Sequence, residues 1–158
     1  MRAIINIGIS GSGKSSWTAD FLKKNNDYLR INRDDLRQVC VKDLKEYYLR
    51  KDLKLLEDII TNMESDLFIN YIKFNKNIII DNTNLKEKDI NKWLYLFMIH
   101  NVDFSFKLFD CDLDIAKQRV MNRDNLIEVE TGYIDKQYKN YKNIKKQILK
   151  NYEDQIIQ

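Results

Sequence analysis

The sequence predicts a three-layer α/β sandwich, in which a small parallel sheet of four or five strands lies between layers of helices. Three observations lead to this prediction. Strand patterns and helix patterns alternate four times along the chain. The third strand pattern, “NIII” at residues 77–80, is continuously apolar and indicates a strand buried on both faces. A glycine-rich loop at residues 8–13 joins the first strand pattern to the first helix pattern.

The composition is that of one soluble globular domain, covering residues 1–158. The chain has no proline, and 44% of its residues are hydrophobic and 32% charged. Its two cysteines lie too far apart in sequence to form a CxxC pair or a zinc knuckle, so we expect a reduced, cytoplasmic protein. The N-terminal apolar run “AIINIGI” is too short for a signal peptide or a membrane span. A net charge of +3 permits nucleic-acid binding without indicating it.

The first half of the chain begins with an isoleucine-rich strand over residues 3–9, followed by a helix that carries Trp17 and Phe21 at helical spacing. “YLRIN” at residues 28–32 predicts a second strand, and “RDDLRQV” predicts a helix whose first turn is acidic, as the helix dipole favours. A longer helix follows, and its single apolar stripe favours packing on a sheet over a coiled coil. That stripe consists of Leu49, Leu53, Leu56, Ile60, Met63 and Leu67.

The second half of the chain continues the alternation after the isoleucine strand. We expect a helix over residues 85–100, a strand over residues 102–110, and a helix capped by the side chain of Asp112. The last helix is predicted over residues 134–156, and its many lysines are interpreted as a solvated face rather than a nucleic-acid contact. Its apolar stripe consists of Ile134, Tyr138, Tyr141, Ile144, Ile148 and Tyr152.

The loop after the first strand carries a phosphate-binding motif. Residues 8–15 match G-x-x-x-x-G-K-[ST] between a strand and a helix, where backbone N–H groups can all point at one anion. The glycines permit positive φ angles and close approach, Lys14 is expected to reach the β- and γ-phosphates, and Ser15 to bind Mg²⁺. The residues predicted to contact the phosphates of ATP or another nucleoside triphosphate are Gly8, Ser10, Gly11, Ser12, Gly13, Lys14, Ser15 and Ser16.

The rest of the sequence favours a small kinase. The GTPase signatures N-K-x-D and D-x-x-G are absent, and the chain is too short for a motor or a large ATPase. A kinase needs a base for the acceptor hydroxyl, and “INRDDLRQ” offers Asp34 or Asp35 at the end of the second strand. Arg37, one helical turn from Asp34, is expected to bind an anionic part of the acceptor. Helix capping by the aspartates is the alternative.

Two further sets of candidates lie beyond later strands. Asp81 has the position of a Walker B carboxylate and is a candidate for holding Mg²⁺ through water, with a buried turn cap as the alternative. Arg119 and Arg123 lie one helical turn apart. We expect these two arginines to close over the triphosphate and to neutralise the charge that develops during transfer.

Together, “GISGSGKSSW”, “INRDDLRQ”, “IIIDNTNL” and “AKQRVMNR” resemble the kinase domain of phage-type 5′-polynucleotide kinases, from the first residue to about residue 145. The resemblance implies an adenylate-kinase-like P-loop kinase fold, with a tunnel through which a single-stranded 5′ end reaches Asp34. It implies that Lys14 and Ser15 bind ATP and metal. It also implies that Asp34 is the general base, that Arg37 binds the acceptor's 3′ phosphate, and that Arg123 clamps the donor phosphates.

The resemblance extends to a third motif, which in this family reads D-T-N or D-N-T-N. Asp81, Asn82 and Thr83 are therefore expected to contact substrate, and either Asp81 or Asn82 fills the acidic residue's role. A lid-like segment is expected near residues 119–133. Many relatives carry a phosphatase with the motif D-x-D-G-[TV], but “DCDLD” at residues 110–114 has leucine in place of the glycine, so no 3′-phosphatase activity is expected.

The leading hypothesis is an ATP- and Mg²⁺-dependent kinase that phosphorylates the 5′-hydroxyl of single-stranded or end-frayed DNA or RNA and serves nucleic-acid repair. If the protein is encoded by a phage, its place is the host cytoplasm. One alternative keeps the fold and changes the acceptor to a nucleoside or another small hydroxyl compound. Another is a non-catalytic nucleotide-binding regulatory module, against which Lys14, Ser15 and Asp34 argue. The preference for DNA or RNA, the donor base and the oligomeric state stay open.

Overall fold

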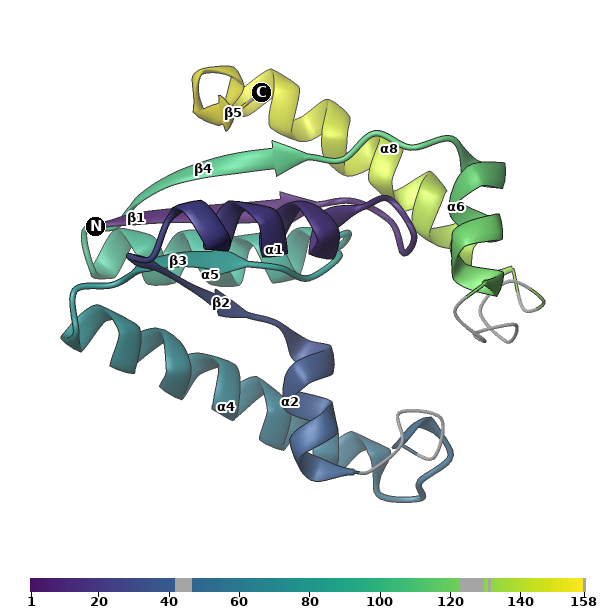
Figure 1. Cartoon of the computed structure of the whole chain (residues 1–158), viewed down its shortest axis with the longest axis horizontal. Coiled ribbons are helices and arrows are strands. Elements are labelled where there is room, and N and C mark those ends of the chain that lie inside the picture. Colours follow the sequence, from purple (N-terminus) through teal and green to yellow (C-terminus); the bar gives the residue numbers. More distant parts are fainter. Residues whose placement is uncertain (42–46, 123–129, 131, 158) are drawn as a thin grey trace.

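The computed structural model describes residues 1–41, 47–122, 130 and 132–157, and its centre is a five-stranded sheet (Figure 1). All neighbouring strands are parallel, in the order β2-β3-β1-β4-β5. The strands are β1 (Arg2–Ile7), β2 (Tyr28–Ile31), β3 (Asn77–Ile80), β4 (Asp103–Leu108) and β5 (Ile156–Ile157). This arrangement confirms the predicted α/β fold and its small parallel sheet.

The helices form a layer on each face of the sheet. The described ones are α1 (Lys14–Lys24), α2 (Arg33–Cys40), α4 (Leu53–Lys73), α5 (Glu87–Ile99), α6 (Leu113–Met121), α8 (Tyr133–Asn151) and the 3₁₀ helix η1 (Glu153–Gln155). Figure 1 shows α1 in front of the sheet and α5 behind it. Phe97 of α5 packs on Phe68 of α4 and on Phe104 of β4, and Tyr152 at the end of α8 packs on the same Phe104. Helices α4, α5 and α8 therefore share one face, which confirms the three layers.

The core of the sheet is built from isoleucine. Ile78, Ile79 and Ile80 of β3 are completely buried, which confirms the expectation drawn from “NIII”. Ile5 and Ile7 of the neighbouring β1 are also 0% exposed. Because β1 and β3 are packed on both faces, the loops that follow them are anchored to a rigid part of the sheet. Ligands of parallel sheets bind at the carboxyl ends of the strands, where these loops lie.

Two boundaries of the predicted helices were wrong. Leu49, assigned to the apolar stripe of the long helix, precedes α4 and is 83% exposed. The buried residues of α4 are Leu56, Ile60, Glu64 and Phe68. The last helix ends at Asn151 rather than at residue 156, because the chain turns through η1 and adds β5 beside β4. Helix α4 packs on β2 and β3, as expected for a helix that lies on a sheet.

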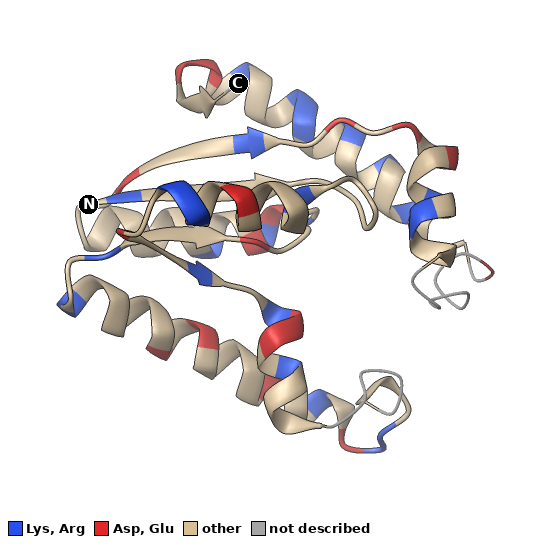
Figure 2. Cartoon of the chain, viewed as in Figure 1, with Lys and Arg blue, Asp and Glu red and all other residues tan. Residues whose placement is uncertain are grey.

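Other details of the second half agree with the prediction. The Asp112 side chain caps α6 by accepting hydrogen bonds from the backbone N–H groups of Asp114 and Ile115, at 2.9 and 3.2 Å. Several lysines lie along α8 (Figure 2), and one of them, Lys145, pairs with Asp110. Among the helices that the structure describes, none combines the length and the apolar composition needed to cross a bilayer.

Candidate active site

The phosphate-binding loop runs from the end of β1 into the start of α1. Gly11 and Gly13 have φ angles of +78° and +97°, which side chains rarely adopt. A Cβ on Gly8 would lie 2.7 Å from Ser12 Oγ and 2.9 Å from Phe109 Cβ, so the loop closes tightly on itself and on the end of β4. The glycines predicted to shape the loop are therefore required by its geometry.

The polar groups of this loop fit an anionic ligand. Lys14 is buried, and its ammonium donates to the carbonyl oxygen of Ile9 at 2.7 Å, inside the loop. The hydroxyl of Ser12 is buried and has no hydrogen-bond partner within the described part of the chain. Ser15 and Ser16 lie exposed in the first turn of α1, whose N–H groups favour negative charge. These residues are suited to hold the phosphates of a nucleotide.

Two side chains, one from α6 and one from α8, form hydrogen bonds with the backbone of the phosphate loop. Gln137 of α8 is buried, and its Oε1 accepts a hydrogen bond from the backbone N–H of Ser10 at 2.7 Å. Arg119 of α6 donates to the carbonyl oxygen of Gly11 at 3.2 Å. The structure thus places Arg119 against the phosphate loop, and its contact with a triphosphate stays a prediction. Arg123 lies outside the described residues. Gln137 is a residue that sequence reasoning missed, although it lies on the apolar stripe between Ile134 and Tyr141.

The start of α2 is capped by Asn32. Its Oδ1 accepts hydrogen bonds from the backbone N–H groups of Asp34 and Asp35, at 2.9 and 3.1 Å. The aspartate side chains are therefore free of the capping role, which removes the alternative considered for them. Asp34 is 60% exposed and accepts from Arg37 Nη1 at 2.6 Å, so the predicted common face of these two residues is confirmed.

Asp35 lies in a different environment from Asp34. Its carboxylate is 3.2 Å from Nη1 of Arg30, which comes from β2. Partial burial raises the pKa of Asp35, and the charge of Arg30 opposes that shift. Arg30 also lies 2.9 Å from the carboxylate of Asp81 through its Nε, so it bridges the two acids.

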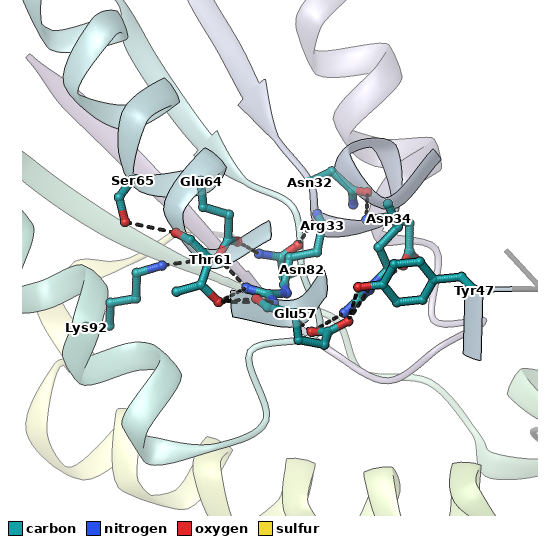
Figure 3. Close-up of polar contacts among 11 residues, drawn as sticks. Asn32, Arg33, Asp34, Tyr47, Glu57, Thr61, Glu64, Ser65, Asn82 and Lys92 are labelled. Carbon is teal, nitrogen blue, oxygen red and sulfur yellow. Dashed lines mark hydrogen bonds and ion pairs between the residues drawn. The ribbon is translucent and has the colours of Figure 1, made fainter. Parts of the chain in front are cut away.

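Arg37 is held by Glu57 of α4, a residue that sequence reasoning missed. Glu57 accepts from Arg37 Nε at 2.9 Å and from Nη2 at 3.1 Å, which makes a bidentate pair. It also accepts from Arg33 Nη2 at 2.7 Å and from the hydroxyl of Tyr47 at 2.9 Å (Figure 3). Burial alone would raise the pKa of Glu57, but the bonds from Arg37 and Arg33 outweigh it and hold that pKa at about 2. Glu57 is therefore ionised in the folded protein at neutral pH.

Glu64, about two helical turns after Glu57 on α4, contacts Arg33 at the start of α2. It is 2% exposed, and its carboxylate accepts from Arg33 Nη1 at 2.6 Å, Lys92 Nζ at 3.1 Å and Asn82 Nδ2 at 2.9 Å (Figure 3). The Oδ1 of Asn82 accepts from the backbone N–H of Arg33 at 2.9 Å. Asn82, predicted to contact substrate, thus ties the start of α2 to α4. The available signal for Glu64 was a single acid at the apolar spacing of Leu56, Ile60 and Phe68.

Asp81 sits where the ends of three strands meet. Its side chain is completely buried, Oδ1 accepts from Asn6 Nδ2 at 3.0 Å, and Oδ2 faces Arg30. Its backbone oxygen accepts from the side-chain amide of Asn32. These contacts favour the structural alternative for Asp81, and its role toward Mg²⁺ stays a prediction. Within residues 1–41, 47–122 and 132–157, no cluster of three or more His, Cys, Asp or Glu side chains is arranged to hold a metal ion.

The geometry joins both halves of the predicted site at one sheet edge. The backbone N–H of Gly8 donates to the carbonyl oxygen of Thr83 at 3.2 Å, and the N–H of Asp81 donates to the carbonyl oxygen of Ile31 at 2.9 Å. The phosphate loop after β1, the Asp81–Thr83 segment after β3 and the start of α2 after β2 are therefore connected side by side.

Comparisons with known proteins agree with this architecture. The model of the family described as AAA domain matches residues 4–144. A protein of Autographa californica nuclear polyhedrosis virus, named as a bifunctional polynucleotide kinase/RNA ligase, is 31% identical over 147 residues. That alignment covers 89% of this chain but 21% of the viral protein, so the chain spans only a part of the length of this relative.

Solved structures show the same similarity. A chain from a structure of the Pnkp1/Rnl/Hen1 RNA repair complex has a TM-score of 0.76 and 25% identity, over 92% of this chain and 45% of that one. A second Pnkp1/Rnl/Hen1 structure gives a TM-score of 0.64 and 29% identity, over 75% of this chain and 38% of that one. Deoxyadenosine kinase from M. mycoides, at 18% identity and a TM-score of 0.59 over 98% of this chain and 88% of its own, shares the fold.

Proposed function

Because the chain belongs to the AAA domain family and is related to polynucleotide kinases of RNA repair systems, we propose that it is an ATP-dependent polynucleotide 5′-hydroxyl kinase. Its proposed acceptor is the 5′-hydroxyl end of a single-stranded or end-frayed RNA or DNA. The relatives named above supply the substrate class, and the residues of α2 supply the chemistry.

The observation that carries the proposal is the Asp34–Arg37 pair on α2, whose start is bonded to the segment after β3 that also contacts the phosphate loop. Asp34 is exposed, so an acceptor hydroxyl can reach its carboxylate, and Arg37 holds that carboxylate at 2.6 Å. The pair stands on α2, which is joined through Asn32 and Asp81 to the strand that leads into the phosphate loop. A hydroxyl acceptor and a nucleotide donor would thus meet at one sheet edge.

In the proposed reaction, Asp34 takes the proton of the 5′-hydroxyl as that oxygen bonds to the γ-phosphorus of ATP. The bond from the γ-phosphorus to the bridging oxygen breaks, and ADP leaves with the electron pair. Lys14 and the N–H groups of the loop bind the donor phosphates, and Arg37 contacts a phosphate of the acceptor. Mg²⁺, with Ser15 as its proposed protein ligand, would neutralise charge on the phosphates. Arg123 is proposed to clamp the donor, and Arg119 holds the loop that binds it.

The direct test is transfer of labelled phosphate from ATP to an oligonucleotide with a 5′-hydroxyl. We expect wild-type transfer and a loss of about 100-fold or more in kcat for Asp34→Asn, since general-base catalysis contributes that much. Asp35→Asn is the matched control, because Asp35 pairs with Arg30, and we expect it to stay within a few-fold of wild type. Absence of transfer by the wild type, or full activity of Asp34→Asn, contradicts the proposal.

A second arm separates polynucleotide acceptors from small ones. Oligonucleotides, nucleoside 3′-monophosphates and nucleosides are compared with wild type and Arg37→Ala. We expect Arg37→Ala to lose activity on the acceptors that carry a 3′ phosphate, because its guanidinium is the proposed contact for that group. Preference for free nucleosides, with no effect of Arg37→Ala, would instead identify a small-molecule kinase.

A further inference from the structure

Two aromatic side chains, Tyr47 and Tyr48, lie against Arg37 of α2. The Cζ atom of Arg37 is 5.7 Å from the ring centroid of Tyr47 and 5.8 Å from that of Tyr48. The two tyrosine rings are perpendicular, with centroids 5.4 Å apart. Tyr47 is completely buried and donates its hydroxyl hydrogen bond to Glu57, whereas Tyr48 is 53% exposed. Tyr48 is thus positioned by two neighbours while much of its surface faces solvent.

Arg37 itself keeps part of its hydrogen-bonding capacity. A guanidinium has five N–H donors. Two of them contact Glu57, one contacts Asp34, and the guanidinium also donates to the Tyr47 hydroxyl, which leaves one among the contacts with described residues. A phosphate oxygen can use this donor beside the exposed ring of Tyr48. Anion binding and an aromatic surface therefore lie next to each other.

We propose that Tyr48, backed by Tyr47 and Arg37, is a stacking surface for a nucleobase of the acceptor strand. This inference rests on the proposed function, because it needs an acceptor whose phosphate contacts Arg37. Phosphates and bases alternate along a nucleic-acid chain, so a strand bound by its phosphate at Arg37 has bases within reach of the adjacent ring. Every base has a π-face, so this contact adds affinity for polynucleotides without reading their sequence.

The test compares Tyr48→Ala and Tyr48→Phe with wild type on three acceptors. One is an intact 5′-hydroxyl oligonucleotide, and the others lack the base of the first or of the second nucleotide. We expect Tyr48→Ala to raise the acceptor KM about 10-fold on the intact strand, within the 5- to 150-fold range of stacking on one base, with kcat within about 2-fold of wild type. Tyr48→Phe keeps the ring and is expected to match wild type. Tyr95→Ala is the control, since Tyr95 is 60% exposed on α5.

The abasic acceptors separate stacking from a structural effect. If Tyr48 stacks on one base, removing that base raises the wild-type KM and abolishes the difference between wild type and Tyr48→Ala. An equal KM for Tyr48→Ala and wild type on the intact strand overturns the inference. So does a loss of the same size on both abasic strands, because the residue then acts only through Arg37.

A binding measurement keeps this inference distinct from the proposed function. Fluorescence anisotropy of a labelled oligonucleotide reports affinity without phosphate transfer. Base-dependent binding that Tyr48→Ala weakens, in a protein that transfers no phosphate, supports the stacking surface and contradicts the kinase proposal. Transfer by the wild type with no effect of Tyr48→Ala does the reverse, and absence of both binding and transfer overturns both.

Discussion

Glu57 of α4 forms ion pairs with two arginines of α2, Arg33 and Arg37. It joins Arg33 and Arg37 to Tyr47, and each of its oxygens has at least two partners among these side chains. An isolated, exposed ion pair contributes little to stability. Glu57 instead accepts four hydrogen bonds, two of them from Arg37, and this arrangement is expected to fix the guanidinium of Arg37. We therefore expect Glu57 to affect binding of the proposed acceptor through Arg37 rather than by touching it.

The pKa of Glu57 predicts how this contribution depends on pH. The pKa falls from 4.5 to about 2 on folding, so the ion pairs stabilise the fold above pH 4.5 and this stabilisation is lost as the pH falls toward 2. Because the side chain is 34% exposed, solvent reduces the effect to about 1–2 kcal/mol. Urea unfolding should show wild type more stable than Glu57→Gln by this amount at pH 7. A gap that does not narrow between pH 4.5 and pH 2.5 contradicts the assignment.

Glu64 is expected to matter more for stability than for chemistry. It is buried beneath Arg33 and Lys92, so Glu64→Ala leaves two cations without their shared carboxylate and should lower the free energy of unfolding by about 3–5 kcal/mol. Asp66→Ala on the exposed side of α4 is the control and should change it by less than about 0.5 kcal/mol. Chemical denaturation checks both, and equal stability of the two variants would rule out this role.

The sequence predicted the positions of candidate site residues well where the interacting residues are close together in the chain. The phosphate loop and the Asp34–Arg37 pair each lie within one short segment, so their spacing predicted their geometry. Glu57, Glu64 and Gln137 contact residues that lie 18 or more positions away in the sequence, on helices whose polar positions look ordinary. Nothing in local spacing specifies which polar residue of a helix points at a distant loop.

At the scale of elements, α2 depends on its cap. Asn32 accepts from two backbone N–H groups and also donates to the backbone oxygen of Asp81, so one amide caps α2 and joins its start to the end of β3. Asn32→Ala should lower the free energy of unfolding by about 1–2 kcal/mol and displace Asp34. Asn32→Asp keeps the acceptor for the cap and should recover most of the stability. Thermal and urea unfolding check the two variants, and equal losses would show that the contact with Asp81 dominates.

Gln137 of α8 is expected to affect the binding of ATP, because it bonds to the phosphate loop. Gln137→Leu removes the acceptor for the Ser10 N–H, and loss of one such hydrogen bond should raise the KM for ATP about 2- to 10-fold while the acceptor KM is unchanged. Gln147→Leu, at an exposed position of the same helix, is the control. Initial rates at varied ATP and at varied oligonucleotide separate the two constants. A rise in the acceptor KM alone would contradict a role on the donor side.

Burial was predicted well in the most regular patterns, whereas the ends of the long helices were missed. The isoleucine run of β3 and most of the α8 stripe are buried as predicted, but only Leu56 and Ile60 of the stripe assigned to the long helix are buried. Strand β5 has two residues and follows a single turn of 3₁₀ helix, so its pattern does not differ from that of a helix end. Pairing with β4, which the sequence does not encode locally, makes it a strand.

Over the molecule as a whole, the proposed donor and acceptor sides come from different parts of the chain. The proposed donor side combines residues 8–16 with Arg119 and Gln137, and the proposed acceptor side combines α2 with α4 and the segment after β3. Strand β1 lies between them at the centre of the sheet. A change at Gln137 and a change at Glu57 should therefore act additively on stability, because they share no partner.

The contact between Gln137 and Ser10 joins residues 127 positions apart, and this spacing sets an order of events during synthesis. The phosphate loop leaves the ribosome before Gln137, its partner on α8. A nascent chain can therefore form β1 and α1 early, but the N–H of Ser10 gains its acceptor only after α8 has been made. A phosphate loop with all its supporting contacts would then report that the chain has been translated and folded through α8.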